Sequence, residues 1–219
     1  MTIIQNRKAA GQRLAEKINK ILNEEKPIVL AIPRGGVVIG EEIAKKLDCS
    51  LDVVISMKIT PPSSPEYAIC AITHDGTIYY GQYWDRFSQE PNFDEEINKK
   101  KLEVKRRLEE YRGSANYKFD NRTVILVDDG IATGATVFVL LKWLAEKKVK
   151  RIILAVPVIP RNTYEEMKPM VDTIVALKIP AEFYAVGQFY KEFDQVSDKE
   201  VMTILDKFKN PQTADNGIS

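Results

Sequence analysis

The chain has 219 residues, of which 44% are hydrophobic and 29% charged, and its formal net charge is +1. This length allows one substantial core, and the charge gives no global electrostatic case for binding nucleic acid or an anionic membrane. No apolar run reaches the roughly 20 residues that span a bilayer, and residues 1–13 lack the apolar core of a signal peptide. Two cysteines without metal-ligand spacing are typical of a reduced, cytoplasmic protein.

Helical and extended patterns alternate along the chain. The predicted helices have apolar residues at helical spacing and cover residues 6–24, 36–48, 94–112 and 134–148. The predicted strands are short apolar runs and cover residues 27–32, 51–57, 67–73, 77–81, 123–128, 151–157 and 172–177. Such alternation predicts an α/β fold with a parallel sheet covered on both faces.

One domain over residues 1–207 is predicted, with a mobile insertion at 59–115 and a disordered tail at 208–219. The insertion begins with a Pro-rich loop and continues into a hairpin that turns at His74, Asp75 and Gly76. His74 is the only histidine, which excludes a His-rich metal site and indicates a solvated turn residue. The charged helix 94–112 is either solvated or partner-facing, since acidic neighbours offset its basic residues.

The most informative stretch is residues 124–136. Four β-forming residues predict a buried strand that ends in Asp128 and Asp129, and a turn of small residues leads into an apolar helix near Gly134. Ligands of open α/β sheets bind outside the carboxyl ends of strands. The helix start offers N–H groups to a phosphate, while paired carboxylates suit sugar hydroxyls or a divalent cation. The stretch therefore predicts a cradle for ribose 5-phosphate.

A second phosphate loop is predicted at residues 33–36, Pro-Arg-Gly-Gly, between a strand and an amphipathic helix. Paired glycines expose backbone N–H groups, and Arg34 supplies a fork of donors that matches phosphate oxygens. Neither a Walker A loop nor a dinucleotide fingerprint is present. Lys58, at the end of the third strand, either faces the same crevice or is a surface lysine.

The stretch 124–136 resembles the 5-phosphoribosyl-1-pyrophosphate (PRPP) motif of type I phosphoribosyltransferases: four hydrophobic residues, two acidic residues, a variable step and Thr-Gly-x-Thr. The resemblance implies a Rossmann-like fold in which the acidic pair contacts the ribose hydroxyls, the following turn wraps the 5′-phosphate and the 33–36 loop contacts pyrophosphate. The implied PRPP contacts are Arg34, Gly35, Gly36, Lys58, Asp128, Asp129, Gly130, Ile131, Ala132, Thr133, Gly134, Ala135 and Thr136.

Residues 6–11, 65–69, 156–158 and 185–193 resemble a subgroup of bacterial and archaeal phosphoribosyltransferases of undefined acceptor, over roughly residues 6–207. Cys70 departs from the glycine expected there. Family analogy implies a homodimer. It also implies that a variable hood, here residues 178–193, recognises the acceptor. Its aromatic residues Phe183, Tyr184, Phe189 and Tyr190 either stack a planar heterocycle or pack a core.

Ala132 stands where 6-oxopurine phosphoribosyltransferases carry an aspartate base, which weakens a hypoxanthine or guanine specificity. Glu66, in the loop, is a candidate general base or a solvated side chain. The implied reaction transfers the phosphoribosyl group of PRPP to a nitrogenous acceptor such as a nucleobase. Mg²⁺ is expected to be held mainly by PRPP, with possible help from Asp128 and Asp129, and Arg34 and Lys58 to stabilise the departing pyrophosphate. A PRPP-sensing regulator or a subunit that needs a partner enzyme are the alternatives.

Overall fold

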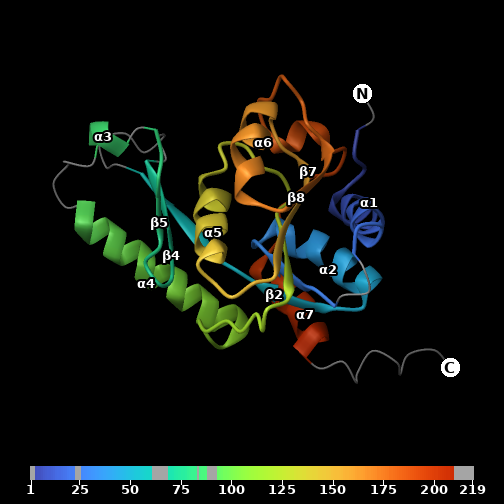
Figure 1. The fold of residues 1–219 in the computed structure, drawn as a ribbon, viewed down its shortest axis with the longest axis horizontal. Helices are drawn as coiled ribbons and strands as arrows, with labels where there is room; N and C mark the ends of the chain where they lie inside the picture. Colours follow the sequence, from blue (N-terminus) through green and yellow to red (C-terminus); the bar gives the residue numbers. More distant parts are fainter. Residues whose placement is uncertain (1–2, 23–25, 61–68, 83, 88–92, 210–219) are drawn as a thin grey trace.

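The computed structural model describes residues 3–22, 26–60, 69–82, 84–87 and 93–209. Its centre is a five-stranded parallel sheet with the strand order β2-β1-β6-β7-β8 (Figure 1). These strands are β1 (Ile28–Ala31), β2 (Ser50–Val53), β6 (Thr123–Val127), β7 (Arg151–Val158) and β8 (Thr173–Lys178). Every residue of β1 and β6 is buried, as expected of a parallel sheet with both faces covered. The predicted fold class is therefore confirmed.

Helices form an apolar layer on each face of this sheet. One layer contains α1 (Arg7–Asn19), α2 (Gly35–Leu47) and α7 (Asp198–Lys209), and the other contains α5 (Ala135–Ala145) and α6 (Arg161–Met167). Side chains alternate between the faces along a strand. Accordingly, Ile125 and Val127 of β6 pack in the first layer, and Val124 and Leu126 pack in the second. None of the described helices is both long and apolar enough to cross a membrane.

The prediction of one strand over residues 51–57 is wrong. The segment contains two strands, β2 in the parallel sheet and β3 (Ser56–Ile59) in a separate antiparallel sheet with β4 (Cys70–Thr73) and β5 (Ile78–Tyr80). The N–H of Val54 makes a last hydrogen bond to the carbonyl of Ala31, and Ser56 already pairs with Thr73. Val54 and Ile55 are both buried. The apolar run therefore continues where the chain passes from one sheet to the other, so its sequence pattern does not indicate that the strand ends.

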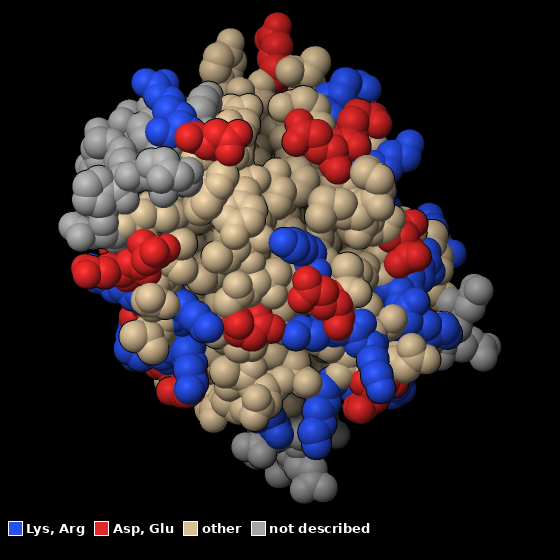
Figure 2. Space-filling model, turned by 60° about the vertical axis from the view of Figure 1, so that its left-hand side comes forward, with Lys and Arg blue, Asp and Glu red and all other residues tan. Residues whose placement is uncertain are grey.

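The charged helix predicted over 94–112 is α4 (Phe93–Arg112), which lies along the antiparallel sheet beyond the short helix α3 (Trp84–Phe87) (Figure 1). A narrow buried stripe that includes Val104 and Leu108 faces the protein. Its exposed side is covered by ion pairs of opposite charges one turn apart. Figure 2 likewise shows acidic and basic side chains interspersed on one face of the molecule. Such pairs stabilise a solvated helix only weakly.

The hairpin turn at residues 74–76 is confirmed, but the prediction that His74 is solvated is wrong. The imidazole is half-buried, with its ring centroid 5.5 Å from that of Tyr117 and 5.7 Å from that of Trp143. Burial lowers the pKa of His74. The apolar surroundings come from residues that are distant in sequence, so the turn pattern alone could not indicate them.

The C-terminal part contains elements that the sequence patterns did not predict. These are α6, the single turns η1 (Lys168–Met170) and η2 (Val186–Phe189), and α7. Lys207 of α7 donates to Glu41 of α2, whose side chain is only 4% exposed and also pairs with Lys45. Residues 208–209 belong to α7 rather than to a disordered tail, and residues 210–219 lie outside the described part.

Candidate functional site

The acidic pair lies at the carboxyl end of β6, in the middle of the parallel sheet. The N–H of Asp129 donates to Oδ1 of Asp128 at 2.8 Å, so the two residues share one tight turn. The next residue, Gly130, has φ of 157°, and a Cβ there would lie 2.3 Å from a methyl carbon of Val186. Only glycine fits this close approach of the turn to the C-terminal segment.

Unpaired donors follow the acidic pair. Within the described part of the chain, none of the N–H groups of residues 132–136 has a hydrogen-bond acceptor. Gly134, with φ of 77°, lets the chain turn sharply into α5, whose first bonds run from Val137 and Phe138 back to its carbonyl. Ala132 and Thr133 are exposed. The start of α5 therefore combines N–H groups that lack a protein acceptor with the positive end of the helix, an arrangement that binds phosphate.

Lys58 lies beside this turn, because β3 passes next to α5. Its ammonium donates to the hydroxyl of Thr133 at 3.2 Å, and Ser56 on the same strand donates to the carbonyl of Thr136 at 3.0 Å. The strand is thus fixed to the start of α5 at two points. Lys58 is exposed and lies beside the 132–136 turn, and whether it contacts a ligand stays a prediction.

The 33–36 loop is held against the same end of β6. The N–H of Ile32 donates to the carbonyl of Val127 at 2.8 Å, and a Cβ added at Gly36 would lie 2.8 Å from that same oxygen. The peptide bond between Pro33 and Arg34 is cis. The two loops predicted to bind phosphates are therefore side by side at the carboxyl edge of the sheet.

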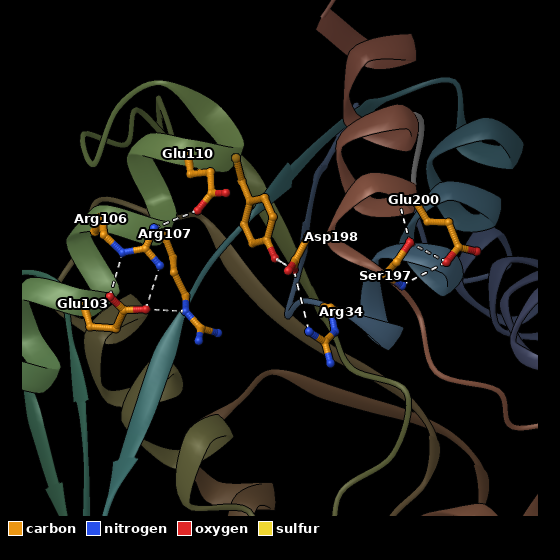
Figure 3. Close-up of polar contacts among 9 residues, drawn as sticks. Arg34, Glu103, Arg106, Arg107, Glu110, Ser197, Asp198 and Glu200 are labelled. Atoms are coloured by element: carbon orange, nitrogen blue, oxygen red, sulfur yellow. Dashed lines mark hydrogen bonds and ion pairs between the residues drawn. The ribbon is translucent and has the colours of Figure 1, made fainter.

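Arg34 lies at the outer side of its loop, between α4 and α7 (Figure 3). Its guanidinium is about half exposed, with Nη1 3.8 Å from a carboxylate oxygen of Asp198. The hydroxyl of Tyr111 in α4 donates to the same oxygen. Burial, followed by the Asp198 hydrogen bond, raises the pKa of Tyr111 to about 12, so the phenol stays protonated. Arg34 remains within reach of solvent and of an anionic ligand.

Sequence reasoning missed Arg7 as a site residue. Its Nη2 and Nε lie 2.7 and 2.8 Å from Oδ2 of Asp129, and the two side chains are only 12% and 19% exposed. A Cβ added at Gly35 would lie 1.9 Å from that oxygen, so the ion pair requires glycine there. Arg7 and Asp129 are 122 positions apart. The one indication in the sequence was that residues 6–11 resemble the corresponding segment of the phosphoribosyltransferase subgroup.

The two carboxylates of the pair differ in their surroundings. Burial raises the pKa of Asp128 well above its ordinary value, and the negative charge of Asp129 raises it further, while Lys58 acts in the opposite direction. Asp129 has a cationic partner in Arg7, whereas Asp128 accepts a backbone N–H. The turn therefore carries less net negative charge than two isolated carboxylates.

The candidate acceptor residues are divided by the structure. Phe189 and Tyr190 are 5% and 6% exposed, because η2 turns them into the protein, so they pack a core and do not present a stacking surface. Phe183 stacks on Phe189 at 5.6 Å between centroids and is half-buried, and Tyr184 is 87% exposed. Of the four, only Phe183 and Tyr184 retain exposed surface. Glu66 lies outside the described residues.

The described residues contain no group of three or more His, Cys, Asp or Glu side chains that could hold a metal ion. The acidic pair could contribute Oδ2 of Asp128 and Oδ1 of Asp129, because the other oxygen of each carboxylate has a protein donor. Two carboxylate oxygens fit a Mg²⁺ ion that keeps most of its ligands from water and phosphates.

Comparison with known proteins gives a consistent assignment. A family model described as "Phosphoribosyl transferase domain" matches residues 1–191. The Mycobacterium tuberculosis protein named "Putative phosphoribosyl transferase Rv0571c" is 35% identical in an alignment 214 residues long that covers 94% of this chain and 47% of that protein. The chain thus spans about half the length of the curated relatives that it matches.

Two solved structures are similar to this chain. The crystal structure of TT1426 from Thermus thermophilus is 34% identical, has a TM-score of 0.79, and is matched over 94% of this chain and 99% of its own. The AQ2163 protein from Aquifex aeolicus is 14% identical, with a TM-score of 0.50 over 79% of this chain and 74% of its own, which shows a shared fold.

Proposed function

Since the chain belongs to the phosphoribosyl transferase family, we propose that it transfers the 5-phosphoribosyl group of PRPP to a nitrogenous acceptor and releases pyrophosphate. One observation carries the proposal: spare carboxylate oxygens and unpaired N–H groups occupy a single turn after β6. A ribose 5-phosphate has hydroxyl donors and a phosphate acceptor about one sugar ring apart, and this turn offers the complement of both.

Each loop would bind a different part of PRPP. The N–H groups of residues 132–136, with Thr133 and Lys58, would bind the 5′-phosphate. The acidic pair would accept hydrogen bonds from the ribose hydroxyls. The 33–36 loop lies beside them and would bind the pyrophosphate through its backbone N–H groups and Arg34. Mg²⁺ bound to PRPP would supply further neutralisation of the pyrophosphate charge.

Catalysis would be mainly electrostatic. The bond from C1′ to the pyrophosphate oxygen breaks, the electron pair leaves with pyrophosphate, and the acceptor nitrogen forms the new bond to C1′. Arg34 and the loop N–H groups stabilise the leaving group, and the carboxylates stand near the positive charge that develops on the sugar. Phe183 and Tyr184 are the two of the four candidate aromatic residues with enough exposure to contact a heterocyclic acceptor.

The test is acceptor-dependent pyrophosphate release from PRPP and Mg²⁺ with a panel of nucleobases and other nitrogen heterocycles. The Asp128→Asn/Asp129→Asn variant should lose this release. A matched control is Asp94→Asn/Glu95→Gln, which removes two exposed carboxylates from the first turn of α4. The control should release pyrophosphate at the wild-type rate.

Two results would contradict the proposal in different ways. Tight PRPP binding without release for any acceptor would favour the PRPP-sensing regulator. Absence of PRPP binding would remove the assignment of the 124–136 turn altogether. The homodimer implied by family analogy belongs to the same proposal and is tested by light scattering of the purified chain.

A further inference from the structure

Two segments from opposite ends of the chain meet at Asp129. Ile4 forms a parallel β-bridge with Tyr190, which places the start of α1 next to the segment after η2. The guanidinium of Arg7 lies 3.9 Å from the centroid of the Phe193 ring, and that ring stacks on Tyr190 at 4.8 Å. Arg7, Phe193 and Tyr190 thus form one stack, and both outer members of the stack bond to Asp129.

These bonds fix both the backbone and the side chain of Asp129. The hydroxyl of Tyr190 donates to its carbonyl at 2.7 Å, and Nε and Nη2 of Arg7 both contact Oδ2. Nη1 of Arg7 donates to the carbonyl of Asp194 at 2.6 Å, so the guanidinium is held on several sides. Within the described part of the chain, Oδ1 of Asp129 has no hydrogen-bond donor.

The carboxylate of Asp128 likewise has one oxygen that accepts a hydrogen bond from the protein and one that does not. Oδ1 of Asp128 accepts the N–H of Asp129, and Oδ2 accepts from no backbone N–H or basic side chain among the described residues, although the two carboxyl groups lie close enough to interact. Each carboxylate therefore uses one oxygen within the protein and leaves one free. A vicinal diol presents two hydroxyl donors, which matches two free acceptor oxygens from adjacent residues.

We propose that Arg7 and Tyr190 are positioning residues that direct Oδ1 of Asp129 toward a ribose hydroxyl. Arg7 also compensates one of two negative charges next to a ligand that carries phosphates, which would otherwise be repelled. This inference rests on the proposed function, because it assigns the ligand of Asp129 as the ribose of PRPP. It gives Tyr190 and Phe193 a role in holding a carboxylate.

A purely structural role for Arg7 would be to attach the start of α1 to the C-terminal segment. The two roles differ in what they do to ligand selectivity. If Arg7 only attaches α1, its removal should lower the affinity for every ligand alike or lower the stability of the fold. If Arg7 positions Asp129, its removal should abolish the preference for a sugar that has the hydroxyl over a sugar that lacks it. The phosphate contacts are made by the 132–136 turn and should not change.

The experiment compares dissociation constants for ribose 5-phosphate and its 2-deoxy and 3-deoxy analogues, measured by calorimetry or by competition with PRPP. The wild-type protein should prefer ribose 5-phosphate to at least one analogue by about tenfold, since a hydrogen bond to a charged group is lost. In Arg7→Met this preference should fall to about twofold, with the affinity for that analogue nearly unchanged. Arg7→Lys should retain part of the preference.

Tyr190→Phe removes only the hydroxyl and keeps the stacked ring, so this variant tests the positioning role even if Arg7→Met does not fold. It should reduce the same preference by about threefold. The matched controls are Arg13→Met, an exposed arginine on α1, and Tyr80→Phe, an exposed tyrosine in β5. Both controls should keep the wild-type preference.

Unchanged selectivity in folded Arg7→Met and Tyr190→Phe would overturn the positioning role and leave the proposed function standing. Absence of selectivity in the wild-type protein would overturn it as well, because Asp129 would then not bind a ribose hydroxyl. Failure of the wild-type protein to bind either PRPP or ribose 5-phosphate would instead contradict the proposed function.

Discussion

Two turns in this molecule place aspartates soon after a buried strand, and they use them in opposite ways. Asp75 follows β4 in the hairpin, and Asp128 and Asp129 follow β6 in the parallel sheet. The oxygens of Asp75 accept five hydrogen bonds from the protein, donated by the hydroxyl of Thr73, the N–H and hydroxyl of Thr77, the indole of Trp143 and the ammonium of Lys147. The pair after β6 keeps one free oxygen on each carboxylate, as far as the described residues go.

The pKa values of the two turns move in opposite directions. Burial alone would raise the pKa of Asp75, but its hydrogen bonds, beginning with those from Thr73 and Lys147, hold it well below the ordinary value. Burial and the charge of Asp129 raise the pKa of Asp128. A carboxylate saturated by protein donors is a structural anchor, and one with spare acceptors is available to a ligand. Donor saturation therefore distinguishes the two turns better than their sequences do.

The largest effect is expected when the spare acceptors are removed. Asn in Asp128→Asn keeps the acceptor for the N–H of Asp129 but replaces an oxygen directed at the ligand by an amide. Acceptor-dependent pyrophosphate release should fall by about a hundredfold. The free energy of unfolding should stay equal or rise, because a buried like-charge pair is relieved. Kinetics and urea denaturation measure the two quantities, and a large loss of stability would make Asp128 a structural residue.

Removal of the Asp75 carboxylate should have the opposite effects: stability should fall and ligand affinity should stay the same. Asp75→Ala leaves the indole N–H of Trp143 and the hydroxyl of Thr73 without their acceptor, so the free energy of unfolding should fall by about 2 kcal/mol. Affinity for PRPP, measured well below the unfolding temperature, should stay within about twofold of wild type. A clear loss of affinity in the folded variant would place the hairpin in the ligand site.

A pH series sharpens the contrast between the turns. The pKa of Asp75 is lowered in the folded protein, so its stabilising contribution is complete above about pH 5 and is lost progressively as the pH falls from about 4 toward the lowered pKa. The pKa of Asp128 is raised, so its cost appears as the pH rises above about 4. Urea denaturation should therefore show that Asp128→Asn gains stability over wild type with rising pH, while Asp75→Asn loses it. Parallel curves for the two variants would contradict this.

The smallest effect is expected from removing one of the five donors to Asp75. Lys147 is 33% exposed and its ammonium lies 5.2 Å from the Trp143 ring centroid. Lys147→Met keeps an apolar chain over the indole, and four donors remain. The free energy of unfolding should fall by about 0.5 kcal/mol. A decrease above about 2 kcal/mol would show that this ion pair, rather than the full set of donors, holds the turn.

The sequence predicted those parts of the site that are contiguous along the chain. Residues 124–136 contain a strand, a turn and a helix start in order, so local patterns specify the geometry. The alternation of elements was enough for the parallel sheet, because burial on both faces leaves continuous apolar runs. For Lys58 the pattern left two positions open, and its contact with Thr133 depends on the passage of β3 beside α5.

What the sequence could not predict depends on contacts between distant segments. The passage from β2 to β3 occurs within one apolar run, and its pattern is the same in either sheet. The burial of Phe189 and Tyr190 depends on η2 and on Ile4, far away in the sequence. The pairing of Arg7 with Asp129 has no local signature, since a charged residue at the start of a helix is ordinarily solvated.

The missing side chain at Gly35 has a consequence for how this site can change over evolutionary time. Any β-carbon at position 35 would overlap the carboxylate of Asp129 that Arg7 holds. A substitution at one of these three positions therefore alters what the other two can accept. Positions 7, 35 and 129 should co-vary among relatives, and a lineage that gains a side chain at 35 should have lost the acid at 129 together with the arginine at 7.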